Sequence, residues 1–319
     1  MPPVITEMKN FEDDLAKMVK NINFRPYNDS FLNVVDDDLN KIKKSPNILI
    51  FADKTRNIYE TSLENYQKLL TENITNTYKS GSDNLTNEIN AERKEISKSL
   101  LIDDRIEVMA TKNAFITLKD HKENFDSNPK CRLLNPTKSE LGKVSKVILD
   151  TINDNIRSTI NVNQWKNSQS MIEWFKAIDN KPSHTFLSFD IVEFYPSISE
   201  ELLDRVISWA KSVTTISDEH IKVIKHARKS LLFNNNKTWV KRENDSLFDV
   251  AMGSDDGAEI CELVGLYILN QLKVKFQGAD VGLYRDDGLV LLNSVNGRTA
   301  DKARKDLHEL FHQMSLKIT

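Results

Sequence analysis

Cysteine, glycine and proline are scarce in this sequence of 319 residues, which holds two Cys, nine Gly and eight Pro. Cys131 and Cys261 cannot build a disulfide framework or a cysteine-based zinc site, and so few cysteines are typical of a reducing compartment. No apolar run approaches the roughly 18 residues that a membrane-spanning helix needs, and the first residues lack the apolar core of a signal peptide. We therefore expect an intracellular protein, in the nucleus or the cytoplasm, without membrane contact.

A strong charge of one sign is also lacking, because the formal net charge is −3, but the basic residues are unevenly placed. Between Lys112 and Lys146, eight Lys or Arg stand against four Asp or Glu. A local basic surface is what a nucleic-acid backbone requires, although such a stretch can also be simply solvated. With 39% hydrophobic and 29% charged residues, the composition does not suggest a disordered chain, and the length of 319 residues suggests one large or two medium domains.

Two apolar segments within Val281–Leu292 flank the residues Tyr-Arg-Asp-Asp-Gly, a pattern typical of a β-hairpin. We expect Gly288 to supply the permissive backbone of the turn, with Asp286 and Asp287 exposed at its tip. A hairpin with apolar flanks presents carboxylates only where solvent or a ligand compensates them, so this pair is a candidate metal site. Other adjacent aspartates lack such flanks and are interpreted as solvated surface: Asp13-Asp14, Asp36-Asp37-Asp38, Asp103-Asp104 and Asp255-Asp256.

A second carboxylate segment lies about a hundred residues earlier, in Thr185–Ile198. Its aromatic and β-branched residues predict a strand that ends on Asp190, and Pro196 stops it. Ser199 is then expected to cap a helix with acidic residues in its first turn. One carboxylate at a strand end and two on a neighbouring hairpin are a minimum ligand set for two Mg²⁺ ions about 3.5–4 Å apart. This combination indicates nucleotidyl transfer.

The same segments resemble the conserved motifs of a known family. Phe189–Ile198, Met252–Ser254 and Tyr284–Asp287 resemble, in order and spacing, motifs A, B and C of retroelement reverse transcriptases. Upstream segments are similar to the fingers motifs of Penelope-like elements: Ala52–Lys54, Phe115–Lys122 and Cys131–Pro136. The resemblance covers roughly residues 45 to 319.

The resemblance implies an α+β fold, a right-hand polymerase in which an antiparallel palm sheet carries motifs A and C. Residues 1–45 would form a helical N-terminal extension, residues 46–180 a fingers-like region and residues 181–319 the palm, with a fingers insertion at about 202–250. Because the chain ends soon after motif C, we expect the thumb to be absent and the element copy to be C-terminally truncated.

The resemblance also implies roles for individual residues. Asp190, Asp286 and the backbone carbonyl of Ile191 would hold two Mg²⁺ ions, with Mn²⁺ as a substitute, and Asp287 would assist as a third catalytic carboxylate. The residues expected to bind the nucleotide are Lys54, Lys119, Arg132, Tyr195 and Gly253. Those expected to contact the template or primer are Lys122 and Tyr284. Within the nucleotide set, Tyr195 matches the aromatic residue that excludes a ribose 2′-hydroxyl.

The implied activity is RNA-templated DNA synthesis within a retrotransposable element, from deoxynucleoside triphosphates on a DNA or RNA primer. One departure is in motif B, where Asp255, Asp256 and Gly257 replace a Ser-Pro-like turn. Two carboxylates beside a triphosphate would repel it unless they point away. Two alternatives remain: an RNA-templated RNA polymerase, and a weak or inactive remnant that only binds RNA.

Periodicity predicts further local structure. Residues 1–45 and Leu141–Ile160 have helical spacing, and Asn47–Ala52 is expected to be a buried strand. Trp165 is interpreted as a core residue, with base stacking as the alternative.

Overall fold

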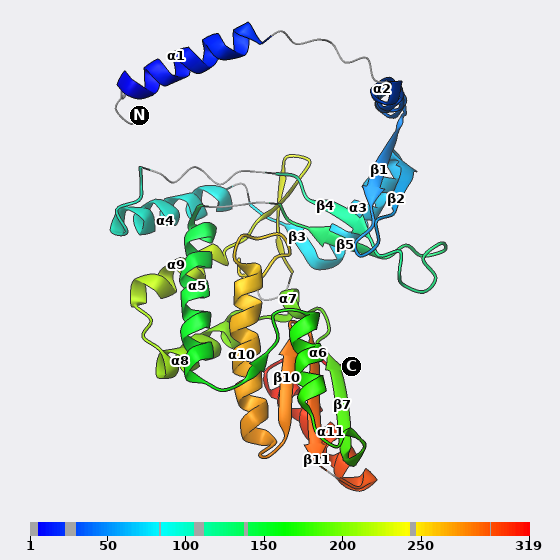
Figure 1. Ribbon diagram of the computed structural model, residues 1–319, viewed down its shortest axis with the longest axis vertical. Helices are drawn as coiled ribbons and strands as arrows, with labels where there is room; N and C mark the ends of the chain where they lie inside the picture. Colours follow the sequence, from blue (N-terminus) through cyan, green and yellow to red (C-terminus); the bar gives the residue numbers. More distant parts are fainter. Residues whose placement is uncertain are drawn as a thin grey trace. The chain divides into compact units, whose positions relative to one another are not determined.

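Figure 1 shows the computed structural model of the chain, which describes seven stretches of residues. The chain forms two compact units, Met1–Ile48 and Leu49–Thr319. The described residues are 6–22, 30–82, 84–104, 112–136, 140–242, 247–293 and 295–319. Lys138 of the basic stretch and residues 243–246 of the expected insertion lie outside them.

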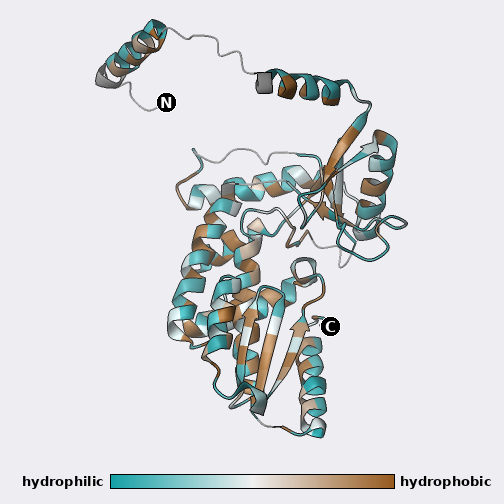
Figure 2. Cartoon of the chain, turned by 45° about the vertical axis from the view of Figure 1, so that its right-hand side comes forward, coloured by the Kyte–Doolittle hydropathy of each residue, from teal (hydrophilic) through white to brown (hydrophobic). Residues whose placement is uncertain are grey.

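The first unit contains two amphipathic helices, α1 (Thr6–Asn21) and α2 (Ser30–Lys44), as the spacing predicts. Hydrophilic and hydrophobic residues alternate around both helices in Figure 2. On α1 the apolar residues Phe11 and Met18 are 66% and 65% exposed. Among the described residues, no helix is both long and apolar enough to cross a bilayer.

A four-stranded sheet organises the second unit, in the order β6-β10-β11-β7. Its strands are β6 (Asn163–Gln164), β7 (His184–Asp190), β10 (Asp280–Tyr284) and β11 (Asp287–Asn293). β11 is antiparallel to both β10 and β7, whereas β6 is parallel to β10. The last residues extend the sheet beside β7, because Asp190 and Thr319 exchange backbone hydrogen bonds of 3.1 and 3.0 Å.

The connections around this sheet follow a β-α-β-β-α-β order, a split βαβ arrangement. Between β7 and β10 lie α8 (Glu200–Val213), α9 (Asp218–Ala227) and α10 (Gly257–Lys275), and α11 (Gly297–Gln313) follows β11. α10 is buried along most of its length and packs on β10 and on α5 (Glu140–Thr159). Figure 1 shows α5 and α10 side by side. The main hydrophobic core therefore surrounds α10.

Different helices pack against the two faces of the four-stranded sheet. Phe189 contacts Phe311 of α11, with ring centroids 5.0 Å apart. On the other face, Phe186 contacts Phe175 of α6 (Ser168–Ala177), which precedes the short helix η1 (Lys181–Ser183). Asp190 follows Phe189, so the alternation of side chains along a strand puts it on the face opposite α11.

Local capping positions the segment after β7. The Ser199 side chain accepts a hydrogen bond of 3.1 Å from the Leu202 N–H, which confirms the predicted helix cap. Before it, a single helical turn, α7 (Phe194–Ser197), begins after Glu193, whose φ is +49°. The strand thus ends at Asp190, and Tyr195 lies on a sharp turn beside the strand end.

The remaining strands form small sheets, and two further helices accompany them. The strand pairs are β1 (Asn47–Phe51) with β2 (Ile58–Ser62) and β4 (Phe115–Leu118) with β5 (Cys131–Leu134). A three-stranded sheet contains β3 (Tyr78–Ser80), β9 (Lys237–Lys241) and β8 (Leu232–Asn234). The helices are α3 (Leu63–Thr77) and α4 (Leu85–Ser99).

The prediction that β1 is buried is wrong. Ile50 is buried, but Leu49 and Phe51 are 42% and 63% exposed. A two-stranded sheet covered on one face leaves alternate residues of each strand in solvent. An apolar run of this length therefore does not by itself indicate burial.

Gly288 is required in the hairpin for a reason other than the expected one. The positive φ of the turn belongs to Arg285, at +56°, and Gly288 does not have one. Instead, Gly288 is opposite Phe189 in the β11–β7 pair, and a Cβ at this position would overlap the Phe189 ring. The glycine is needed for close packing of the strands.

We expect Gly288→Ala to lower the free energy of unfolding by about 1–3 kcal/mol, because overpacking forces ring and backbone apart. Urea denaturation measures this change. Gly297→Ala is the matched control, since a Cβ there meets nothing within 4 Å, and it should be neutral or slightly stabilising. Equal stability of the two variants would contradict the packing role of Gly288.

Candidate active site

Two strand ends bring the three predicted catalytic carboxylates together. Asp287, the first residue of β11, is directly opposite Asp190, the last residue of β7. Asp287 also pairs with Tyr284, which leaves Arg285 and Asp286 as a two-residue turn. The Ile191 N–H donates a hydrogen bond of 2.9 Å to the Asp286 carbonyl, so the turn is tied to the backbone just after β7.

The electrostatics show that these carboxylates interact. The pKa of Asp190 is raised by partial burial and by the charge of Asp286. The pKa of Asp287 is raised by partial burial and by the charges of Asp286 and Asp190. Despite this partial burial, all three residues remain accessible to solvent, and within the described part of the chain no salt bridge joins their side chains to a cation. Negative charge is thus concentrated at this end of the sheet.

The donor set fits a hard divalent cation, because carboxylate oxygens are the ligands that Mg²⁺ and Mn²⁺ prefer. As arranged, no three His, Cys, Asp or Glu side chains of the described residues converge closely enough to hold a metal ion. Ile191 follows Asp190 directly, as a ligating carbonyl would require.

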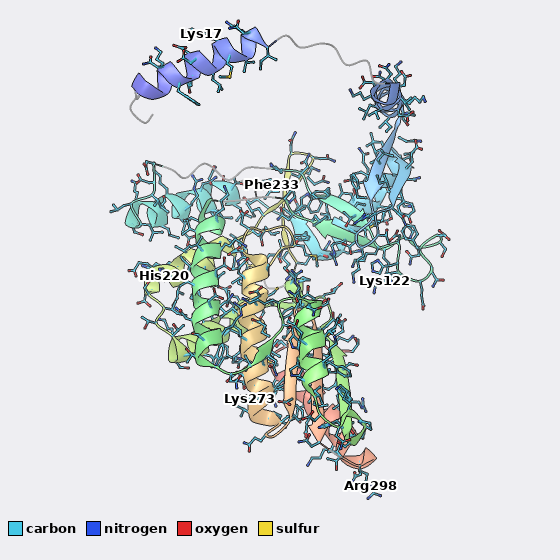
Figure 3. All side chains as sticks on the ribbon, viewed as in Figure 1. Lys17, Lys122, His220, Phe233, Lys273 and Arg298 are labelled. Carbon is cyan, nitrogen blue, oxygen red and sulfur yellow. The ribbon has the colours of Figure 1, made fainter. Side chains whose placement is uncertain are left out.

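Two lysines from distant segments reach this cluster. The charges of Lys122 and Lys54 oppose the rise in the pKa of Asp190, and Lys54 does the same for Asp287. Lys54 follows β1, and Lys122, labelled in Figure 3, belongs to the loop between β4 and β5. The charges of these two predicted ligand-binding residues therefore act on the carboxylates.

Arg132 and Lys119 are two further basic residues among those predicted to bind the nucleotide. The Arg132 guanidinium Nη1 lies 2.7 Å from Oδ1 of Asp53, which is 8% exposed. The Asp53 N–H donates a 2.8 Å hydrogen bond to the Leu118 carbonyl and so joins the turn after β1 to β4. Burial and the charge of Arg132 lower the pKa of Lys119. Asp53 thus orients Arg132.

Tyr195 is half-buried beside the start of α10. A Cβ on Gly257 would lie 3.5 Å from the Tyr195 Cε1, so the ring packs over this glycine. Burial raises the pKa of Tyr195 to about 12. The phenol stays protonated at neutral pH and acts as a packing surface.

Gly253 is fixed by a partner that the sequence did not indicate. Its φ is +99°, and a Cβ there would lie 2.9 Å from the Asn135 carbonyl oxygen. The Asn135 N–H donates a 3.2 Å hydrogen bond to the Met252 carbonyl. The Asn135 amide also donates to Ser230 Oγ at 3.1 Å. The Met-Gly turn is therefore held against the end of β5.

The extra aspartate Asp256 points away from the carboxylate cluster. It is fully buried, forms an ion pair with Arg228 and accepts a 2.5 Å hydrogen bond from Ser145 Oγ. Arg228 is 1% exposed, and burial lowers its pKa to about 10, so it remains protonated at neutral pH. The expected repulsion between a bound triphosphate and the carboxylates of Asp255 and Asp256 therefore does not arise from Asp256.

The structure gathers most, but not all, of the predicted site residues. Asp190, Asp286 and Asp287 interact with one another and with Lys54 and Lys122. Tyr284 is half-exposed at the end of β10, with the Arg285 guanidinium 5.8 Å from its ring centroid. Tyr284 is joined to Asp287 through the β10–β11 pairing, whereas among the described residues no interaction links Gly253 to the three carboxylates. Trp165 is 7% exposed, which confirms its interpretation as a core residue.

The fold, with mixed helices and antiparallel sheets, is similar to that of solved structures of telomerase. Apo telomerase from Candida tropicalis truncated from its C-terminal domain matches with a TM-score of 0.57 and 11% identity, over 85% of this chain and 57% of that chain. Apo telomerase from Candida tropicalis matches with a TM-score of 0.58 and 10% identity, over 85% of this chain and 51% of that chain.

A third structure, telomerase from Candida albicans in complex with a TWJ fragment of telomeric RNA, gives a TM-score of 0.54 and 10% identity, over 91% of this chain and 51% of that chain. This chain thus spans about half the length of these telomerases. No protein-family profile and no curated protein sequence matches it. At such identities the likeness concerns the fold alone.

Proposed function

We propose that this protein is an RNA-directed DNA polymerase that works by two-metal nucleotidyl transfer. One observation carries the proposal: the β11–β7 register sets Asp287 opposite Asp190, with Asp286 on the adjoining turn. Lys54 and Lys122, which interact electrostatically with Asp190, support it by adding positive charge where a triphosphate requires it.

The mechanism assigns a task to each group. Two Mg²⁺ or Mn²⁺ ions would activate the primer 3′-hydroxyl and neutralise the leaving pyrophosphate. Asp190, Asp286 and the Ile191 carbonyl would hold these ions, and Asp287 would assist. Around them, Arg132, Lys54 and Lys119 would bind the triphosphate of the incoming deoxynucleotide, and Gly253 would let the backbone approach the base pair. Lys122 and Tyr284 would contact the template or primer.

The finer assignments belong to the same proposal. The split βαβ unit would be the palm, and the sheets that contribute Lys54, Lys119 and Arg132 would be the fingers. The RNA template, a DNA or RNA primer and deoxynucleoside triphosphates would be the partners. A Penelope-like retroelement would be the source of the sequence, and the nucleus or the cytoplasm its location.

Primer extension by the purified chain tests the proposal. The chain is incubated with an RNA template, a labelled DNA primer, deoxynucleotides and Mg²⁺ or Mn²⁺. Template-dependent DNA extension that EDTA abolishes is the expected result. Preference for ribonucleotides would identify an RNA polymerase instead. Template binding without any extension would identify a remnant that only binds RNA.

Tyr195 should govern the choice of sugar at this site. Tyr195→Ala removes the ring that packs over Gly257, so discrimination against ribonucleotides should fall by about tenfold. The measurement is the ratio of kcat/KM for a deoxynucleotide and its ribonucleotide. Tyr195→Phe keeps the ring and should keep the ratio. An unchanged ratio in the alanine variant would remove Tyr195 from this role.

A further inference from the structure

A largely buried lysine on β9 is bonded to the turn that carries Tyr195. Nζ of Lys241 donates a hydrogen bond of 2.7 Å to the carbonyl oxygen of Pro196, the residue after Tyr195. The same Nζ lies 3.7 Å from Oδ1 of Asp249, and the two side chains are 12% and 4% exposed. A buried cation and a buried carboxylate require each other, because burial removes most of the water that would stabilise each charge.

Asp249 also accepts a hydrogen bond, which fixes its position beside the lysine. Tyr78 and Lys241 are directly opposite each other in the antiparallel β3–β9 pair, so both side chains lie on one face. The Tyr78 hydroxyl donates a 2.7 Å hydrogen bond to Oδ2 of Asp249. Burial, with the charge of Asp249, raises the pKa of Tyr78, and the hydroxyl therefore keeps its proton.

The same network also reaches the start of α10, near which the Tyr195 ring packs. The Asp249 N–H donates a 2.9 Å hydrogen bond to the carbonyl of Arg228, whose side chain pairs with Asp256. Asp256 directly precedes Gly257, the glycine under the Tyr195 ring. Lys241 thus connects the turn that carries the ring with the segment that leads to the surface beneath it.

We propose that Lys241 is a positioning residue that fixes the Tyr195 ring and thereby sets the selection of deoxyribose over ribose. The inference rests on the proposed polymerase activity and deepens it. In this role Lys241 acts on the sugar only through Tyr195. Its bond to the Pro196 carbonyl holds the α7 turn at a fixed distance from α10, and removal of that bond lets the ring move away from the sugar.

Lys241→Met tests this role, because it keeps the length of the side chain and removes the donor. We expect discrimination against ribonucleotides to fall by about threefold to tenfold, the loss expected for one hydrogen bond. The KM for the ribonucleotide should fall while kcat for the deoxynucleotide changes little. Lys241→Arg keeps a charged donor and should restore most of the discrimination. Lys237→Met, an exposed lysine on the same strand, is the matched control.

A folding defect is separated from a loss of positioning by a second variant. Lys241→Met with Asp249→Asn removes both charges and still lacks the donor to Pro196, so it should show the same loss of discrimination with better stability. Unchanged discrimination in a folded variant would overturn the inference while primer extension itself continues. Absence of extension by the wild-type chain would overturn the proposed function, and the inference with it.

Discussion

Asp286→Asn should lower deoxynucleotide incorporation by at least about 100-fold, with little change in stability. Residues that only support a metal ligand already contribute about 10–100-fold, so a direct ligand should contribute more. Asparagine has nearly the same shape as aspartate but no negative charge, and the side chain is exposed, so the turn should fold as before. Single-turnover primer extension on an RNA template measures the effect.

Asp280→Asn is the matched control for this experiment, because Asp280 is an exposed aspartate at the other end of β10. It should leave incorporation unchanged. Circular dichroism and thermal melting establish that both variants are folded. Synthesis by Asp286→Asn within a fewfold of the wild-type rate would refute the assignment of Asp286 as a metal ligand. Equal losses in both variants would point to a general effect of hairpin charge.

The second large effect concerns stability. Arg228→Met should lower the free energy of unfolding by about 3–5 kcal/mol, because it leaves the fully buried Asp256 without its cation. The Ser145 hydroxyl would remain as a hydrogen-bond donor but cannot neutralise the carboxylate. Chemical denaturation followed by tryptophan fluorescence and circular dichroism measures the change.

The double variant Arg228→Met with Asp256→Asn separates charge from packing. Replacing both partners of a buried ion pair is far less costly than removing one, so the second change should recover much of the lost stability. Arg205→Met is the matched control, since Arg205 hydrogen-bonds the Gln313 carbonyl on the exposed surface. A loss of less than about 1 kcal/mol in Arg228→Met would contradict the importance of the buried pair.

Local patterns predicted the elements that hold the candidate site. The aromatic strand ending on Asp190, the hairpin around Asp286 and the cap at Ser199 depend on neighbouring residues, and the structure contains all three. Two very short strands, β3 and β6, were not predicted, because two or three residues show no periodicity. Their existence depends on the partner strand.

Non-local features could not be predicted in this way. Nothing near Asp256 in the sequence indicates that it is buried. Its ion-pair partner Arg228 lies at the end of α9, 28 residues earlier in the chain. The need for Gly288 was predicted for the wrong reason, since the ring that requires it lies on a different strand. The electrostatic effect of Lys54 on Asp190 followed only from the family resemblance, because Lys54 follows a strand of a different sheet.

The β11–β7 pairing also constrains how the chain folds. The hairpin of β10 and β11 is local and can form early, whereas Asp190 meets Asp287 only after about a hundred residues have been brought into register. The backbone bonds between Asp190 and Thr319 close a longer loop still. The carboxylate cluster is therefore expected to be one of the last features to form during folding, and a partly folded chain would have its hairpin but no acidic site.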